Sequence, residues 1–145
     1  MMMRATLLAC LALMGCTRSQ GPVMFGRAMS VEAIMEQVIN PGATAFWGAW
    51  GEVSDNRGVH SLRPATEAEW KVAENGAATV AEAARLLLLP PRRVDDLDWT
   101  TYARSLSDVA TEALEATKAK DYERMGEVGE RLDKACEACH QKYAH

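Results

Sequence analysis

The chain has 145 residues, with many Ala, Leu, Glu and Met and few Gly and Pro, which predicts one helical domain rather than two. A chain of this length can bury a hydrophobic core. Its net charge is −4 and it contains no block of five like charges, so the composition excludes a nucleic-acid-binding patch and a long charged tail.

The N-terminal residues 1–15 predict a secretion signal. Arg4 supplies a positive charge, and residues 5–14 form an apolar stretch that is too short to cross a bilayer core of about 30 Å. Residues 13–16, with the sequence LMGC, resemble the lipobox of bacterial lipoproteins, which implies that Cys16 is lipidated and becomes the first mature residue. Plain cleavage of the signal is the alternative.

Lipidation of Cys16 would hold the protein on a membrane, because each buried acyl methylene contributes about 0.8 kcal/mol. Thr17 rather than Asp follows Cys16, and this resemblance implies the outer membrane of a Gram-negative cell, with the protein in the periplasm. Residues 1–15 contain one basic residue and no acid, so the mature chain has a charge of −5. We expect residues 16–29 to be a lipid-anchored tether and residues 30–145 to be the folded domain.

The most specific motif in the chain is C-x-x-C-H near its C-terminus. Cys10 lies in the signal and Cys16 is the predicted lipid site, so Cys136 and Cys139 are the cysteines of the mature domain. Residues three apart on a helix share one face, so both thiols can form thioether bonds to the vinyl groups of one haem. His140 then projects from the same face as the proximal iron ligand. The motif predicts one covalently attached haem c.

Three other interpretations of Cys136, Cys139 and His140 are a zinc half-site, a redox dithiol and a structural disulfide. Structural zinc needs more ligands than one imidazole and two thiolates, and the chain has no second cysteine pair. A thioredoxin-like dithiol sits in an α/β context, and no strand pattern is visible in the sequence. The export signal and the helical pattern favour haem attachment.

Apolar residues at three- and four-residue spacing predict four helices, and the polar stretch 51–64 predicts a loop. The first helix is either kinked at Pro41 or restarted there with Asn40 as its cap. The predicted helices are 31–50 with Ser30 as N-cap, 66–88 opened by a capping box of Thr66 and Glu69 and ended by Pro90-Pro91, 98–118 beginning at Asp98, and 121–143 capped by Asp121. The apolar stripe of the last helix is Met125, Val128, Leu132, Cys136, Cys139 and Tyr143.

Short connections make consecutive helices antiparallel, so we expect an all-α, up-down-up-down four-helix bundle with haem near the C-terminal end of the last helix. At 1.5 Å per residue, Met35 and His140 then both lie about 6 to 8 Å from the same end of the bundle. The thioether of Met35 is a candidate distal iron ligand, and packing in the core is the alternative role for this side chain.

Other methionines and histidines are weaker candidates for the distal iron ligand. Met24 and Met29 lie at or before the start of the first helix, His60 lies in the predicted loop at the opposite end, and His145 is terminal. We expect Glu137 to face solvent. The residues expected to surround the haem are Leu86 to Leu89, Tyr102 and Leu106, and those expected to pack together at the far end are Trp47, Trp50 and Trp70.

A C-terminal C-x-x-C-H motif that closes a helical bundle resembles the class II c-type cytochromes, the cytochrome c prime group and its low-spin, Met-ligated relatives. The resemblance covers residues 30–143. Within this range it is carried by the haem motif, by the segment 118–121 that leads into the last helix, and by Tyr143, three residues after His140. Members of the cytochrome c prime group usually carry a basic residue directly after that aromatic residue, where this chain has Ala144. This difference argues against the gas-binding behaviour of that group.

The sequence therefore predicts an exported monohaem c-type cytochrome that is not an enzyme and carries single electrons between redox proteins of the bacterial periplasm. The alternative is a five-coordinate haem protein that binds nitric oxide or other small gases. A third interpretation is a haem-bearing assembly module of a larger complex. Related bundles often pair, so the sequence leaves both a monomer and a homodimer as alternatives.

Overall fold

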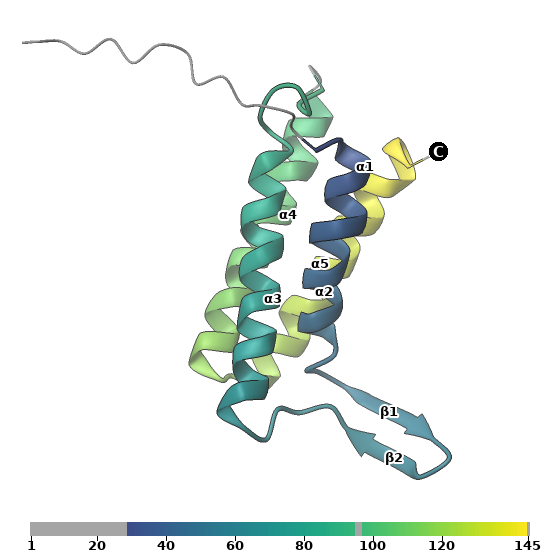
Figure 1. Cartoon of the computed structure of the whole chain (residues 1–145), viewed down its shortest axis with the longest axis vertical. Coiled ribbons are helices and arrows are strands. Elements are labelled where there is room, and N and C mark those ends of the chain that lie inside the picture. The colour runs from purple at the N-terminus through teal and green to yellow at the C-terminus, as the bar shows by residue number, and fades with distance from the viewer. Residues whose placement is uncertain (1–28, 95–96, 145) are drawn as a thin grey trace, which may run out of the picture.

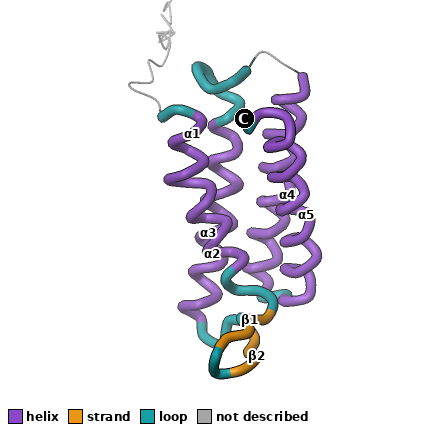
Figure 2. Tube along the Cα trace, turned by 90° about the vertical axis from the view of Figure 1, so that its right-hand side faces the viewer, coloured by secondary structure: helices purple, strands orange, loops and turns teal. Residues whose placement is uncertain are grey.

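The computed structural model describes residues 29–94 and 97–144. This part of the chain is mostly helical, and its helices lie side by side along the long axis (Figure 1). A small two-stranded sheet extends from one end, and the start of the first helix and the C-terminus lie at the other end (Figures 1 and 2). No helix within the described ranges is both long and apolar enough to cross a membrane.

The first helical run consists of α1 (Val31–Ile34), the π-helix η1 (Met35–Ile39) and α2 (Asn40–Trp47). Ser30 caps it as predicted, since its hydroxyl accepts a hydrogen bond from the backbone N–H of Ala33 at 3.1 Å. Pro41 has no N–H to donate to the carbonyl four residues back, and the preceding N–H, of Asn40, donates to the carbonyl of Met35. A π turn therefore carries the helix into Pro41.

Asn40 is not the N-cap of a restarted helix, because its φ of −61° and ψ of −46° are helical. A capping residue has extended backbone, as Ser30 does here. The predicted restart is therefore wrong, and the helical run continues through Pro41 with a wider turn over residues 35–39.

The prediction of a loop over residues 51–64 is wrong in part, because a β-hairpin occupies its centre. Strand β1 (Glu52–Asp55) pairs with β2 (Gly58–Ser61) in antiparallel register, with Asp55 opposite Gly58. Gly58 has a φ of +112°, a conformation that side chains disfavour, so glycine permits this tight turn. Both strands are polar and mostly exposed, and they therefore lack the apolar alternation that predicts a strand.

Helix α3 (Glu67–Leu86) begins with the predicted capping box. The hydroxyl of Thr66 accepts from the N–H of Glu69 at 3.2 Å, and the Glu69 carboxylate accepts from the N–H of Thr66 at 3.0 Å. Helix α4 (Leu97–Ala119) starts one residue before the predicted position. Helix α5 (Tyr122–Tyr143) is capped by Asp121 as predicted, whose carboxylate accepts from the N–H of Arg124 at 3.1 Å.

The core lies between these helices, with α3 packed between α2 and α4, and α4 packed against α5. Its largest fully buried apolar side chains come from α1, α2, α5 and α3 with its C-cap residue, while α4 contributes Trp99, Leu106 and several alanines. The largest fully buried apolar side chains are Phe46, Ile34, Leu87, Met125, Leu132, Val80 and Val128. The remaining core positions are largely alanines, which lets the helices approach closely.

The closest approach between helices joins α2 to α3 at two glycines. A Cβ atom added at Gly76 would lie 2.5 Å from the carbonyl oxygen of Gly42 and 3.0 Å from the Cβ atom of Ala45. Because the nearest atom belongs to the backbone, no side-chain rotation can relieve this overlap. The small residues therefore set the distance between the two helices.

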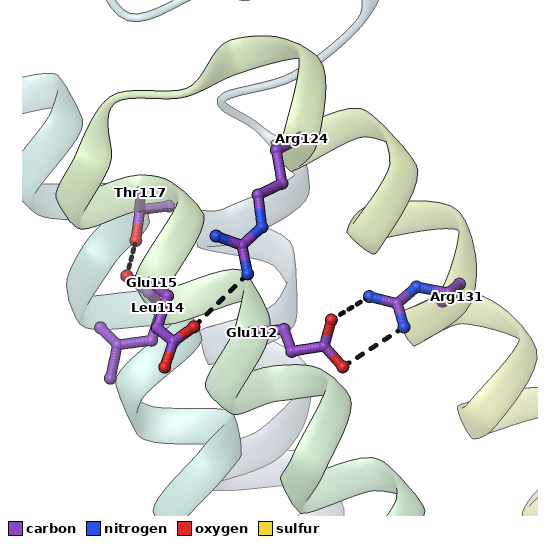
Figure 3. A network of polar contacts seen from close by, with 6 residues as sticks. All are labelled: Glu112, Leu114, Glu115, Thr117, Arg124 and Arg131. Carbon is purple, nitrogen blue, oxygen red and sulfur yellow. Dashed lines mark hydrogen bonds and ion pairs between the residues drawn. The ribbon is translucent and has the colours of Figure 1, made fainter.

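Ion pairs connect α4 to α5 on the surface (Figure 3). Arg131 binds the Glu112 carboxylate with both terminal nitrogens, and Arg124 donates to Glu115 at 3.4 Å. The hydrogen bond from Arg131 lowers the pKa of Glu112. All four side chains are at least partly exposed to solvent, so these pairs contribute little to stability compared with the core.

We predict that Gly76→Ala destabilises the protein by about 1 to 3 kcal/mol, because the added methyl group overpacks the α2–α3 contact. The measurement is the free energy of unfolding from urea titration monitored by circular dichroism. Gly129→Ala is the matched control, since an added Cβ there would meet its nearest neighbour at 3.6 Å, an ordinary contact. We expect the control to be neutral or stabilising by up to about 1 kcal/mol, and equal losses in both variants would contradict the packing argument.

Candidate functional site

The C-x-x-C-H motif lies on the last turns of α5, where the helix ends at Tyr143. Cys136 and Cys139 are half-buried free thiols, and His140 is exposed beside them. The α-helical backbone puts the two sulfur-bearing residues three positions apart on one face of α5. This face turns toward the rest of the bundle, because Leu132, one turn earlier, is fully buried.

A small enclosed cavity of about 30 Å³ lies against this face. Its lining is almost entirely apolar and comes from the first helical run, the end of α3, α4 and α5. The residues that line it are Met35, Ile39, Leu87, Trp99, Tyr102, Ala103, Leu106, Cys136, Cys139 and His140. The motif and the predicted distal residue Met35 therefore border one cavity, although 105 positions separate Met35 from His140 in the chain.

Two open grooves flank the cavity, with volumes of about 380 Å³ and 530 Å³. Met35 and His140 line both grooves as well as the cavity. Cys136 borders the smaller groove and Cys139 borders the larger one. The surface between η1 and the end of α5 is therefore hollow on both sides of the Met35–His140 pair.

The first helical run and α5 come together at the other end, near the hairpin. The indole of Trp50 lies directly on the α5 backbone, since a Cβ atom added at Gly126 would be 2.7 Å from its Cζ2 atom. One turn further along, the indole N–H of Trp47 donates to the carbonyl of Gly129 at 3.4 Å. The two glycines thus make room for the indoles of Trp47 and Trp50 against the backbone of α5.

Three aromatic rings support the site from the α4 side. Trp99 is buried, and its indole N–H donates to the carbonyl of Leu87 at 2.9 Å. Tyr143 packs edge-on against Trp99 and Tyr102, with ring centroids 5.1 Å and 6.2 Å apart. The end of α5 is also fixed by an ion pair of 2.6 Å between Lys142 and Asp98.

The protonation of the thiols distinguishes among the interpretations of the motif. Burial, with smaller contributions from the charges of Asp133 and Cys139, raises the pKa of Cys136 from 9.0 to about 11. Burial also raises the pKa of Cys139. Redox dithiols need a lowered thiol pKa, so both shifts disfavour that interpretation. The two thiols are not joined in a disulfide, and among the described residues no group of three or more His, Cys, Asp or Glu is placed to hold a metal ion.

The structure places most of the predicted site residues as expected. Leu87, Tyr102 and Leu106 line the cavity, and Glu137 is exposed. His60 lies on β2 at the opposite end of the molecule, where its imidazole is 4.0 Å from the Asp55 carboxylate. Met29 is exposed at the start of the first helix and does not line the cavity or its grooves.

One prediction about the surroundings of the site is wrong in part. Of Leu86 to Leu89, only Leu87 lines the cavity; Leu88 is half-buried against the core, and Leu86 and Leu89 are exposed because α3 ends at Leu86. Trp47, Trp50 and Trp70 pack against the core as expected, and Trp47 also borders the smaller groove with Cys136 and His140. The sequence-based predictions did not include Trp99 among the cavity residues. Its position at the start of an amphipathic helix, three residues before Tyr102, could have indicated it.

Some predictions concern residues outside the described ranges. They are the signal over residues 1–15, the lipidation of Cys16, most of the tether 16–29, and the low-ranked residues Met24 and His145.

The residues around the cavity fit a haem in their chemistry. Two unpaired thiols and an imidazole occupy one turn of α5, a thioether lies opposite, and apolar side chains line the space between. The enclosed cavity has room for only about two waters, so a haem must extend into the flanking grooves. The grooves have the volume of typical ligand sites.

Comparison of the chain with protein-family models, with curated proteins and with solved structures finds no match. The function is therefore inferred from the residues of the site.

We predict that Cys136 in the haem-free, folded protein reacts slowly with iodoacetamide at pH 7 and faster as the pH rises toward 11, because the thiolate is the nucleophile. Alkylation measured peptide by peptide with mass spectrometry checks this, with the urea-unfolded chain as the control. The folded pKa lies above the unfolded one, so the neutral thiol stabilises the fold below pH 9 and this contribution is lost between pH 9 and about 11. Equal alkylation rates at pH 7 in the folded and unfolded chain would contradict the prediction.

Proposed function

We propose that this chain is an exported monohaem c-type cytochrome that carries single electrons between redox proteins of the bacterial periplasm. The observation that carries the proposal is that Cys136, Cys139 and His140, on one helical face, line the same apolar cavity as Met35. In this proposal the helices form an antiparallel four-helix bundle, and haem lies near the C-terminal end of α5.

The α5 residues would hold the haem and its iron. Cys136 and Cys139 would each form a thioether bond to one vinyl group, and the imidazole of His140 would ligate the iron. Their spacing fits this role because both thiols and the imidazole leave the helix within a little over one turn. Bound haem supplies an iron that exchanges one electron between its ferric and ferrous states.

Met35 is the proposed ligand on the other side of the iron. It is half-buried at the start of η1 and borders the cavity and both grooves, as His140 does. Ile39, four residues further along the same helical run, also lines the cavity. A neutral thioether ligand raises the reduction potential and favours electron transfer over the binding of small gases.

The surroundings of the site support an electron carrier rather than an enzyme. Trp99, Tyr102 and Leu106 exclude water from the enclosed side, and the grooves leave the other side open to the solvent. An exposed edge permits electron exchange with a partner without substrate entry. Tethering of the domain to the outer membrane through Cys16 is part of the same proposal and rests on the sequence of residues 1–16.

The proposal predicts that the protein, produced with haem-attachment machinery, carries haem that stays bound to the denatured chain. Cys136→Ser with Cys139→Ser removes this covalent haem, because no thiol remains to form a thioether. Haem-stained denaturing gels and the mass of the chain measure the result. The matched control Ser107→Ala removes a buried hydroxyl from α4 that does not line the cavity and should leave the haem attached. A native chain that carries no covalent haem would refute the proposed function.

The proposal also predicts a low-spin ferric spectrum with a sulfur-to-iron band at long wavelength and slow or absent binding of carbon monoxide to the ferrous protein. Met35→Leu should abolish this band and permit rapid carbon monoxide binding, because leucine has a similar size but no sulfur. Met29→Leu is the control, since Met29 lies outside the cavity. A high-spin native spectrum with ready carbon monoxide binding would instead indicate the open, gas-binding site.

A further inference from the structure

Glu32 and Glu36 are the carboxylates that line the space around Met35 and His140. Glu36 borders both grooves, and Glu32 borders the larger one. Among the described residues that line the cavity and its two grooves, Glu32 and Glu36 are the acidic side chains, and none is Lys or Arg. Negative charge therefore lies at the solvent-exposed border of the space proposed for haem.

Both carboxylates belong to the helix that carries Met35. Glu32 and Glu36 are four residues apart and both exposed, which makes them a ridge along one side of α1 and η1. Asp133 acts on the same region from α5, since its charge contributes to the raised pKa of Cys136.

Basic side chains near the site are engaged elsewhere. Lys142, on the last turn of α5, lies 2.6 Å from the Asp98 carboxylate and 5.3 Å from the centre of the Tyr143 ring. Arg131, two turns before His140, binds Glu112 on α4. Arg92 donates to the carbonyls of Leu86 and Met29, at the start of the first helical run. None of these three basic side chains lines the cavity or its grooves, which the two carboxylates border.

We propose that Glu32 and Glu36 stabilise the ferric form of the bound haem and so lower its reduction potential. This inference rests on the proposed function. When one electron passes from a donor to ferric haem, the site loses one positive charge and no bond to the haem is broken. A nearby carboxylate attracts the ferric site more strongly than the ferrous site, so it disfavours reduction. The two residues act as potential-setting groups and do not ligate the iron.

The size of the effect follows from Coulomb's law. For a charge separation of about 10 Å, an effective dielectric constant between about 80 and about 20 gives a change in the ferrous-to-ferric ratio of about 2-fold to about 20-fold per carboxylate. We therefore expect Glu32→Gln with Glu36→Gln to raise this ratio about tenfold at a fixed electrode potential. That ratio corresponds to a positive shift of about 59 mV for a one-electron couple.

The test is an optical redox titration of the full-length holoprotein and its variants. Glu52→Gln is the matched control, because it removes the same charge from β1 at the opposite end of the molecule (Figure 1). We expect the control to change the ratio less than twofold. Raising the salt concentration from about 0.01 M to about 1 M should raise the wild-type potential and have a smaller effect on the double variant, since the Debye length falls from about 30 Å to about 3 Å over this range.

The outcomes separate this inference from the function on which it rests. If the double variant keeps its covalent haem and its spectrum, and its potential matches that of the Glu52→Gln control, the charge inference is overturned and the cytochrome proposal stands. If the wild-type chain carries no haem, the cytochrome proposal fails first. A wild-type potential that does not respond to salt would also overturn the inference, even if the double variant did not fold.

Discussion

The packing of two indoles on two glycines determines where this bundle is closed and where it is open. Trp50 lies on the bare backbone at Gly126, and Trp47 donates to the carbonyl of Gly129, so α2 and α5 meet near the hairpin. The interior there is filled by large side chains such as Phe46 and Met125. Toward the C-terminal end, α5 instead presents thiols and an imidazole to a cavity and two grooves. The candidate site lies where the first helical run and the end of α5 border a cavity and two grooves, away from these indole contacts.

The π turn before Pro41 is the second constraint on the site. Proline cannot donate a backbone hydrogen bond, and the helix widens over residues 35–39 instead of ending. Met35 and Ile39, at the two ends of this turn, line the cavity, and α2 continues from it to the α3 contact at Gly42 and Gly76. A backbone irregularity of this kind is common at functional sites, and here it sits beside the proposed iron ligand.

The electrostatics of the site agree with a role in electron transfer. Burial raises the pKa of both half-buried thiols, in contrast to the lowered thiol pKa of a redox dithiol. Exposed carboxylates border the open side, and aromatic rings cover the enclosed side. Each feature is local to the end of the bundle where α1 begins and α5 ends, so one region of the fold contains the whole proposed chemistry.

The sequence by itself determined the helices, their caps and the candidate ligands, because these depend on residues a few positions apart. Ser30, Thr66 with Glu69, and Asp121 cap helices as predicted, and the spacing of Cys136, Cys139 and His140 already places them on one face. Only the tertiary structure decided that Trp47 borders a groove, that Trp99 lines the cavity and that Leu86 and Leu89 are exposed. It also decided that polar residues 52–61 form a hairpin and that Glu32 and Glu36 border the site. These features depend on distances between helices, and such distances are set by contacts such as those at Gly76 and Gly126, which the spacing of residues along one helix does not encode.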